Sequence, residues 1–185
     1  MDSNWMIERE LTADQACQRI QTELSRLGMT PATLTLGQDV VAVQATFTDS
    51  KGLPVARGAG KGYAVQATIG ALYETLEHYW TDSLPVENAH HIPVDYFADK
   101  AMFNEDPVRL ITRQQNRQIA CRRYTCPQRH DPFYYPLALT SPNTQQFFDQ
   151  QTADCRALRR YSSNSGTAIG ASYNEALLHA INECI

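Results

Sequence analysis

Acidic residues recur at helical spacing in two separate stretches of the chain. Glu74 and Glu77 are three residues apart, and Glu175 and Glu183 are eight apart with His179 midway between them. Residues at these spacings share one face of a helix, so each stretch would present its carboxylates together. If the two faces met, the converging negative charges would need a cation. Mg²⁺ suits that role, because it takes oxygen ligands and is often shared with substrate phosphates.

Glycine-rich stretches precede both acidic segments, GAGKG before the first and SSNSGTAIG before the second. The N-terminus of a helix can receive an anion such as phosphate, and Lys61 can reach one as a point charge. GAGKG is not a Walker A loop, because Val55 stands where the first glycine is required and Gly62 replaces the Ser/Thr. A solvated acidic helix face and a glycine-rich surface turn are the alternatives, and spacing alone leaves both open.

Two other groups of residues have weaker claims to chemistry. Cys121, Cys126 and His130 suggest zinc, but the sequence offers no fourth ligand at a standard spacing. Arg159 and Arg160 lie beside SSNSG, where they either approach a phosphate or form ordinary surface charge. A small zinc protein therefore stays as a minor alternative, which metal analysis would test.

The helices and strands that would position these residues follow from hydrophobic periodicity. Thr12 or Asp14 can cap the start of the first helix, and Gly28 can end it. Helices are expected over residues 12–27, 63–80, within 106–116 and from about 172 to the end of the chain, and strands over 32–37, 40–49, 53–60, 118–125 and 134–139. This mixture predicts one α+β unit.

Composition restricts the class of protein. Hydrophobic residues make up 43% of the chain and charged residues 19%, which is typical of a globular domain, and the net charge of −4 gives no general attraction to nucleic acid. The polar start MDSNWMIEREL does not resemble a signal peptide, and no apolar run approaches the roughly 20 residues of a membrane helix. Five scattered cysteines indicate reduced thiols. We expect a cytoplasmic protein without nucleic-acid or membrane partners.

Taken together, the two acidic stretches resemble the two signatures of the YcaO family. GKGYAVQATIGALYETLEHY resembles the first signature, and SSNSGTAIGASYNEALLHAINE resembles the second. The resemblance covers most of the chain and implies a YcaO-like α+β fold with mixed sheets and acid-bearing helices. It also implies ATP and Mg²⁺ as cofactors, with Glu74, Glu77 and Glu183 as metal ligands and with Lys61 and Glu175 near the nucleotide.

Members of this family typically phosphorylate a backbone amide oxygen of a peptide, which turns a poor leaving group into a good one. The resemblance therefore implies a cyclodehydratase-like enzyme that forms azolines, thioamides or amidines in ribosomally made peptides, or an accessory in methylthiolation. The expected partners are a peptide substrate and a leader-binding protein that presents it. The alternative is a non-catalytic YcaO-like module that binds a peptide or protein, or forms a homodimer through its last helix.

Several positions depart from the family pattern. Gly70, His78 and Ala171 stand where the family commonly has Ser, Arg and Asn, and the family motif places a further Glu three residues after Glu183, at what would be residue 186. We therefore expect residues 1–185 to be the N-terminal portion of a single YcaO-like domain, ending inside a helix and truncated before the C-terminal half. Activity is expected to require a C-terminal portion, and no catalytic residue is predicted.

Overall fold

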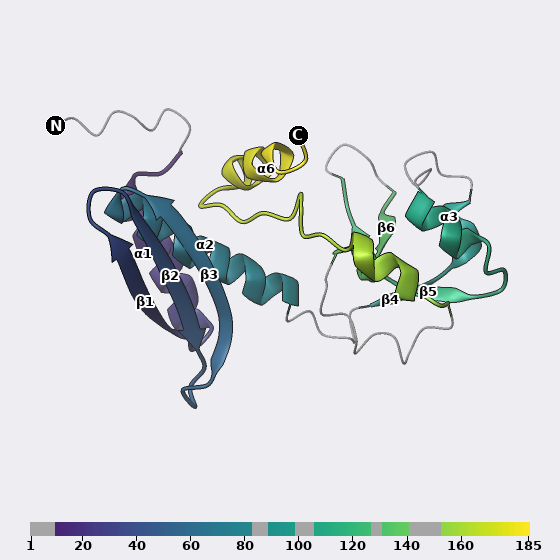
Figure 1. Ribbon diagram of the computed structural model, residues 1–185, viewed down its shortest axis with the longest axis horizontal. Helices are drawn as coiled ribbons and strands as arrows, with labels where there is room; N and C mark the ends of the chain where they lie inside the picture. The colour runs from purple at the N-terminus through teal and green to yellow at the C-terminus, as the bar shows by residue number, and fades with distance from the viewer. Residues whose placement is uncertain (1–9, 83–88, 99–105, 127–130, 141–152) are drawn as a thin grey trace. The chain divides into compact units, whose positions relative to one another are not determined.

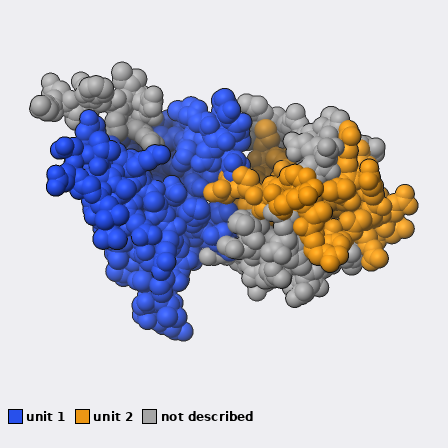
Figure 2. Space-filling view, viewed as in Figure 1, with its two compact units in different colours: residues 1–83, 165–185 blue, residues 84–164 orange. Residues whose placement is uncertain are grey.

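The chain divides into two compact units in the computed structural model, which describes residues 10–82, 89–98, 106–126, 131–140 and 153–185. Unit 1 consists of Met1–Ser83 with Ser165–Ile185, and unit 2 is Leu84–Asn164 (Figure 2). Unit 1 is therefore built from two stretches that are far apart in the sequence. The prediction that residues 1–185 form a single YcaO-like domain stays a prediction. In the described ranges, no helix has both the length and the apolar character needed to cross a membrane.

Unit 1 is a three-stranded antiparallel sheet in the order β1-β2-β3, with helices packed on one face (Figure 1). Its elements are α1 (Ala13–Arg26), β1 (Thr30–Gly37), β2 (Val41–Thr48), β3 (Pro54–Gly62), α2 (Ala64–Asp82) and α6 (Tyr173–Asn182). The predicted helices, strands and β2–β3 hairpin are confirmed. β3 continues through the whole of GAGKG, which was expected to be partly a corner. The last helix was expected to run to the end of the chain, but α6 ends at Asn182 with Glu183 as its C-cap.

The capping of α1 follows the sequence signals. The Thr12 hydroxyl accepts a hydrogen bond from the backbone N–H of Gln15, and the Gln15 side chain accepts one from the N–H of Thr12. This reciprocal pair satisfies two backbone donors that the first turn leaves without helical partners. At the other end Gly28 takes a positive φ of 67°, a conformation that glycine adopts without strain.

The core of unit 1 lies between β2 and the helices. Burial alternates along β2, so that every second side chain from Val41 to Phe47 is buried. These side chains form one cluster with residues of α1 and α2: Ile20, Leu24, Ala67, Ala71, Leu72 and Leu76. Burying each large apolar side chain contributes roughly 1.5–3 kcal/mol, so this cluster fixes α2 against the sheet.

Two glycines explain why α2 sits so close to β3. A Cβ on Gly60 would lie 2.1 Å from the carbonyl oxygen of Ala67 and 2.6 Å from the nitrogen of Ala71, and a Cβ on Gly58 would lie 2.5 Å from the nitrogen of Thr75. The three helix residues are spaced four apart and form a stripe of small side chains. Gly58 and Gly60 therefore allow strand and helix backbones to touch, which is a packing role.

Unit 2 contains a second three-stranded antiparallel sheet, in the order β4-β5-β6. Its elements are β4 (His90–Pro93), the 3-10 helix η2 (Val94–Phe97), α3 (Asp106–Thr112), β5 (Gln118–Tyr124), β6 (Phe133–Pro136), α4 (Leu137–Thr140) and the 3-10 helix η4 (Arg156–Tyr161). The strand predicted over 134–139 is shorter than expected, because the chain turns into α4 after Pro136. Its core joins η2, α3, β5 and η4 through Phe97, Ile111, Ile119, Cys121 and Leu158.

Candidate functional site

Glu77 is a buried acid in the middle of α2. Its side chain is only 6% exposed, and one carboxylate oxygen, Oε2, accepts a hydrogen bond of 3.2 Å from the backbone N–H of Ile169. Burial raises the pKa of Glu77; the hydrogen bond from Ile169 opposes this rise, the negative charge of Glu183 adds to it, and His179 and His78 oppose it. The interaction with Glu183 means that Glu77 on α2 and the acid at the end of α6 are within electrostatic reach of each other.

Glu183 lies at the C-cap of α6. Its Oε2 accepts a hydrogen bond of 3.2 Å from the backbone N–H of Gly166, and its Oε1 lies 3.1 Å from Nε2 of His179, one turn earlier. On α2 the same kind of pair recurs, since Glu74 Oε1 lies 3.7 Å from Nε2 of His78. Glu74 is half exposed. Each acidic helix thus carries an imidazole beside a carboxylate, and residues 166–169 supply backbone N–H groups to both helices.

Glu175 is buried in the first turn of α6 and is surrounded by backbone donors. Its Oε1 accepts a hydrogen bond of 2.7 Å from the N–H of Glu10, and its Oε2 accepts one of 3.2 Å from the N–H of Ala171. Nearby, the Asn174 amide donates to the Glu10 carboxylate at 2.6 Å, and hydrogen bonds from Ser172 and Asn174 lower the pKa of Glu10. In this arrangement the Glu175 carboxylate joins the start of α6 to the segment before α1.

Lys61 lies on the opposite face of the sheet from α2. Its partner across the β2–β3 ladder is Ala42, which is exposed, whereas the neighbouring pair of Gly60 and Val43 faces the helices. Cross-strand partners in an antiparallel sheet share a face, so Lys61 points away from the side that carries Glu77. In the described structure Glu77 and Glu183 accept hydrogen bonds from the same backbone segment, and Glu74 lies one turn before Glu77, whereas Lys61 points to the other face of the sheet.

The glycine-rich stretch SSNSGTAIG was singled out from the sequence, but the backbone hydrogen bonds that residues 166–171 donate to the acids and the neighbouring groove were not predicted. The groove has a volume of about 820 Å³ and is bounded by α1, α2 and residues 168–173. The side chains of Gln15, Gln18, Arg19, Tyr73 and Trp80 line it, and Arg19 donates a hydrogen bond to the carbonyl oxygen of Ala171. The glycines of SSNSGTAIG were a usable signal for this segment, since a Cβ on Gly170 would lie 2.5 Å from the nitrogen of Ala176.

The remaining candidates from the sequence do not assemble. Cys121 is buried in the core of unit 2, where burial raises the pKa of its thiol, and His130 lies outside the described residues. The Arg160 guanidinium lies 4.8 Å from the centre of the Tyr161 ring. Nowhere in the described ranges do three His, Cys, Asp or Glu side chains gather as a ready metal-ligand group.

The acidic site nevertheless fits Mg²⁺ by the chemistry of its donors. Its candidate ligands Glu74, Glu77 and Glu183 all offer carboxylate oxygens, which a hard cation prefers. The charge of Glu183 makes ionisation of Glu77 harder, and a divalent cation between the two helices would reverse that effect.

Comparison with protein families gives a match over residues 58–185 to the family model described as YcaO cyclodehydratase, ATP- and Mg²⁺-binding. The chain belongs to the YcaO family. The match spans both acidic helices, and ATP and Mg²⁺, the cofactors predicted from the sequence, are those named in the description of the YcaO family.

A solved structure gives the same fold. The structure of YcaO from Methanopyrus kandleri bound with AMPPCP and Mg²⁺ matches with a TM-score of 0.55 at 16% sequence identity. The match covers 95% of this chain and 42% of that chain, so this chain spans less than half the length of its structural neighbour. The predicted YcaO-like α+β fold is confirmed. No match was found among curated proteins.

Proposed function

We propose that unit 1 binds ATP with Mg²⁺ between the acidic faces of α2 and α6. The observation that carries this proposal is that Glu77 and Glu183 both accept backbone hydrogen bonds from residues 166–169. These carboxylates belong to helices that are separated by all of unit 2 in the sequence, so one segment orients both acids. The negative charge of Glu183 also adds to the raised pKa of Glu77. The family description as ATP- and Mg²⁺-binding supports the same assignment.

In this proposal Glu74, Glu77 and Glu183 hold the metal. Glu175 organises the site, since its carboxylate holds the start of α6 and the Ala171 backbone in position. Lys61 remains a predicted phosphate contact, although its place on the outer face of β3 gives it no support. The bound Mg²⁺ would neutralise phosphate charge, while the role of the chain's own residues is to bind and orient.

The reaction that this site would serve is phosphorylation of a backbone amide oxygen in a peptide substrate, in azoline, thioamide or amidine formation or as a methylthiolation accessory. The support is the cyclodehydratase description of the family. The proposed activity is cyclodehydratase-like, with a peptide substrate and a leader-binding protein as partners. This chain covers 42% of the structurally similar YcaO chain, so the activity is proposed together with a C-terminal portion.

The second candidate is a non-catalytic module that binds a peptide or protein, or pairs with a second copy through α6. The observation in its favour is that three apolar side chains of α6 are exposed: Leu177, Leu178 and Ile181. Apolar side chains that cluster on one helix usually lie against a partner surface. Light scattering after size-exclusion chromatography distinguishes a dimer from a monomer.

Isothermal titration calorimetry with Mg²⁺ and ATP tests the metal assignment. Glu77→Gln and Glu74→Gln are expected to weaken binding at least tenfold, because each removes a charged ligand while keeping its size. Asp39→Asn is the matched control, since Asp39 is exposed in the β1–β2 turn, away from α2 and α6. If both variants, Glu74→Gln and Glu77→Gln, bind Mg²⁺ and ATP as tightly as the parent chain does, neither acid belongs to the proposed site.

A further inference from the structure

Arg122 on β5 is partly buried, and part of its guanidinium is left without hydrogen-bond partners among the described residues. In the described structure, the Nε and Nη2 atoms of its guanidinium are buried and make no hydrogen bond. Buried charged groups are almost always paired, because losing water without gaining a partner costs several kcal/mol. An arginine in this state therefore indicates that an acceptor completes the site.

Arg122 lies on the face of β5 that does not point into the main core of unit 2. Side chains alternate along a strand, and Ile119 and Cys121 point into the main core of unit 2. Ala120 lies on the other face, where it packs against Leu137 in a small apolar cluster. Arg122, two residues further on, shares the face of Ala120, and its partner across the β5–β6 ladder is Tyr135.

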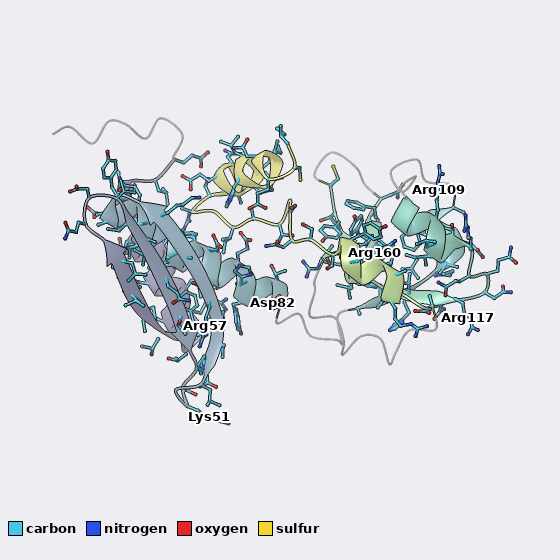
Figure 3. The ribbon with its side chains drawn as sticks, viewed as in Figure 1. Lys51, Arg57, Asp82, Arg109, Arg117 and Arg160 are labelled. Carbon is cyan, nitrogen blue, oxygen red and sulfur yellow. The ribbon has the colours of Figure 1, made fainter. Side chains whose placement is uncertain are left out.

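The described acids of unit 2 are engaged or exposed elsewhere. Asp154 binds Arg156 at 2.6 Å, which lowers the pKa of Asp154 to about 2. Asp95 and Asp131 are exposed. Most of the arginines of the chain also lie in unit 2, and Figure 3 labels three of them, Arg109, Arg117 and Arg160. Positive charge in excess draws anions toward this unit.

The identity of the two unpaired atoms points to a particular anion. Nε and Nη2 lie on the same edge of a guanidinium, and this edge presents two parallel N–H groups to the two oxygens of a carboxylate. The chain uses the same edge twice elsewhere: Arg156 Nε and Nη2 donate to Asp154, and Arg26 Nε and Nη2 donate to Glu23. In Arg122 this edge is buried and free of protein acceptors.

We propose that Arg122 is the recognition group of a carboxylate-binding site in unit 2, separate from the acidic site of unit 1. The ligand is a carboxylate, either of a small acid or of an Asp or Glu side chain in a peptide, held by two parallel hydrogen bonds from Nε and Nη2. This inference stands independently of the proposed nucleotide site, because it rests only on unit 2.

The test uses the full chain, titrated at constant ionic strength with acetate, with a short peptide containing one Glu, and with inorganic phosphate. Binding is followed by the ¹H–¹⁵N signals of arginine Nε–H groups and by the thermal midpoint. Saturable shifts with acetate or with the Glu peptide are expected, and these two arms distinguish a small acid from a peptide side chain. A response to phosphate without any response to carboxylates would overturn the proposal.

The variants Arg122→Met and Arg123→Met form a matched pair, since Arg123 is the next residue and is exposed. The carboxylate response should vanish in Arg122→Met and persist in Arg123→Met, and without ligand Arg122→Met should be at least as stable as the parent chain. Lower stability of a folded Arg122→Met would mean that the guanidinium has a partner within the chain and would refute the site. If Arg122→Met does not fold, Arg122→Lys serves as the test. This variant keeps the positive charge but lacks the planar guanidinium edge, so carboxylate binding should weaken about tenfold or more. Unchanged carboxylate binding by Arg122→Lys would refute the site.

Discussion

The carboxylate of Glu77 on α2 accepts a hydrogen bond from the backbone N–H of Ile169, 92 residues later in the chain. This contact joins two stretches of sequence that are separated by the whole of unit 2. It places the acidic face of α2 against the segment that leads into α6. The candidate nucleotide site therefore depends on a contact between residues far apart in the sequence, and the α2 side and the α6 side of this contact can be tested by separate variants.

Replacing Glu77 with Gln should stabilise the metal-free chain at neutral pH. A carboxyl group whose pKa is raised by folding favours the folded state while it is protonated, and this contribution is lost as the pH rises through its folded pKa. The raised pKa of Glu77 therefore means that the parent chain loses stability relative to Glu77→Gln as the pH rises above about 4.5. Urea denaturation at several pH values measures this difference.

Adding Mg²⁺ and ATP should reverse that order. The ligand pair should raise the unfolding midpoint of the parent chain and leave that of Glu77→Gln nearly unchanged, because the variant lacks the charged ligand. A stability difference that stays constant from pH 4 to pH 8 would contradict the raised pKa of Glu77.

Gly60→Ala should be strongly destabilising. The added methyl group would lie 2.1 Å from the carbonyl oxygen of Ala67, so α2 would have to move away from β3 at a cost of about 1–3 kcal/mol or more. Gly70→Ala is the matched control, because the nearest atom outside the α2 backbone is 3.9 Å from its added Cβ. Since alanine is favoured over glycine within a helix, Gly70→Ala should gain roughly 0.5–1 kcal/mol. Thermal denaturation of both variants measures these opposite effects.

Removing the Glu175 carboxylate should loosen the start of α6. Glu175→Ala leaves the N–H groups of Glu10 and Ala171 without their acceptor, at an expected cost of about 1–3 kcal/mol. Glu175→Gln keeps one acceptor oxygen and should cost less. Hydrogen exchange of the two amides gives a local readout, and unchanged protection in Glu175→Ala would show that other groups hold this segment.

The cysteines should react with thiol reagents in two classes. Cys184 is exposed and Cys17 is partly exposed, whereas Cys121 and Cys155 are buried. Burial, followed by the negative charge of Asp154, raises the pKa of Cys155 to about 12, so this thiol stays protonated and unreactive in the native chain. Mass spectrometry after brief labelling should find Cys184 modified well before Cys121 and Cys155, and equal labelling of all three would contradict the described core of unit 2.

Local patterns predicted much of unit 1. The alternating burial of Val41 to Phe47 and the capping residues of α1 act over a few positions, so the sequence reveals them directly. The role of Gly58 and Gly60 was not predictable in the same way, since it depends on which helix backbone lies across the strand. The orientation of Lys61 was not predictable either, because it depends on strand pairing. The sequence suggested a phosphate contact for Lys61, but pairing with Ala42 places this residue on the outer face of the sheet.

The site residues divide along the same line. The helical spacing of Glu74 and Glu77 was readable from the sequence, whereas their grouping with Glu183 as metal ligands stays a prediction, supported by the effect of the Glu183 charge on the pKa of Glu77. The N–H groups of Gly166 and Ile169 belong to the backbone and carry no residue-type signal beyond the glycines around them. Arg122 was missed because nothing in β5 distinguishes a buried arginine from an exposed one until the sheet is formed.

The discontinuity of unit 1 has a consequence for its biosynthesis. During translation, the segment Met1–Ser83, which carries Glu74 and Glu77, is synthesised first. The segment that completes unit 1, Ser165–Ile185, is synthesised only after Leu84–Asn164. At about 5–20 residues per second this delay lasts roughly 4–16 s. During that interval the acidic face of α2 lacks the Ile169 N–H that orients Glu77, so the emerging chain passes through a stage in which its scaffold precedes its candidate nucleotide site.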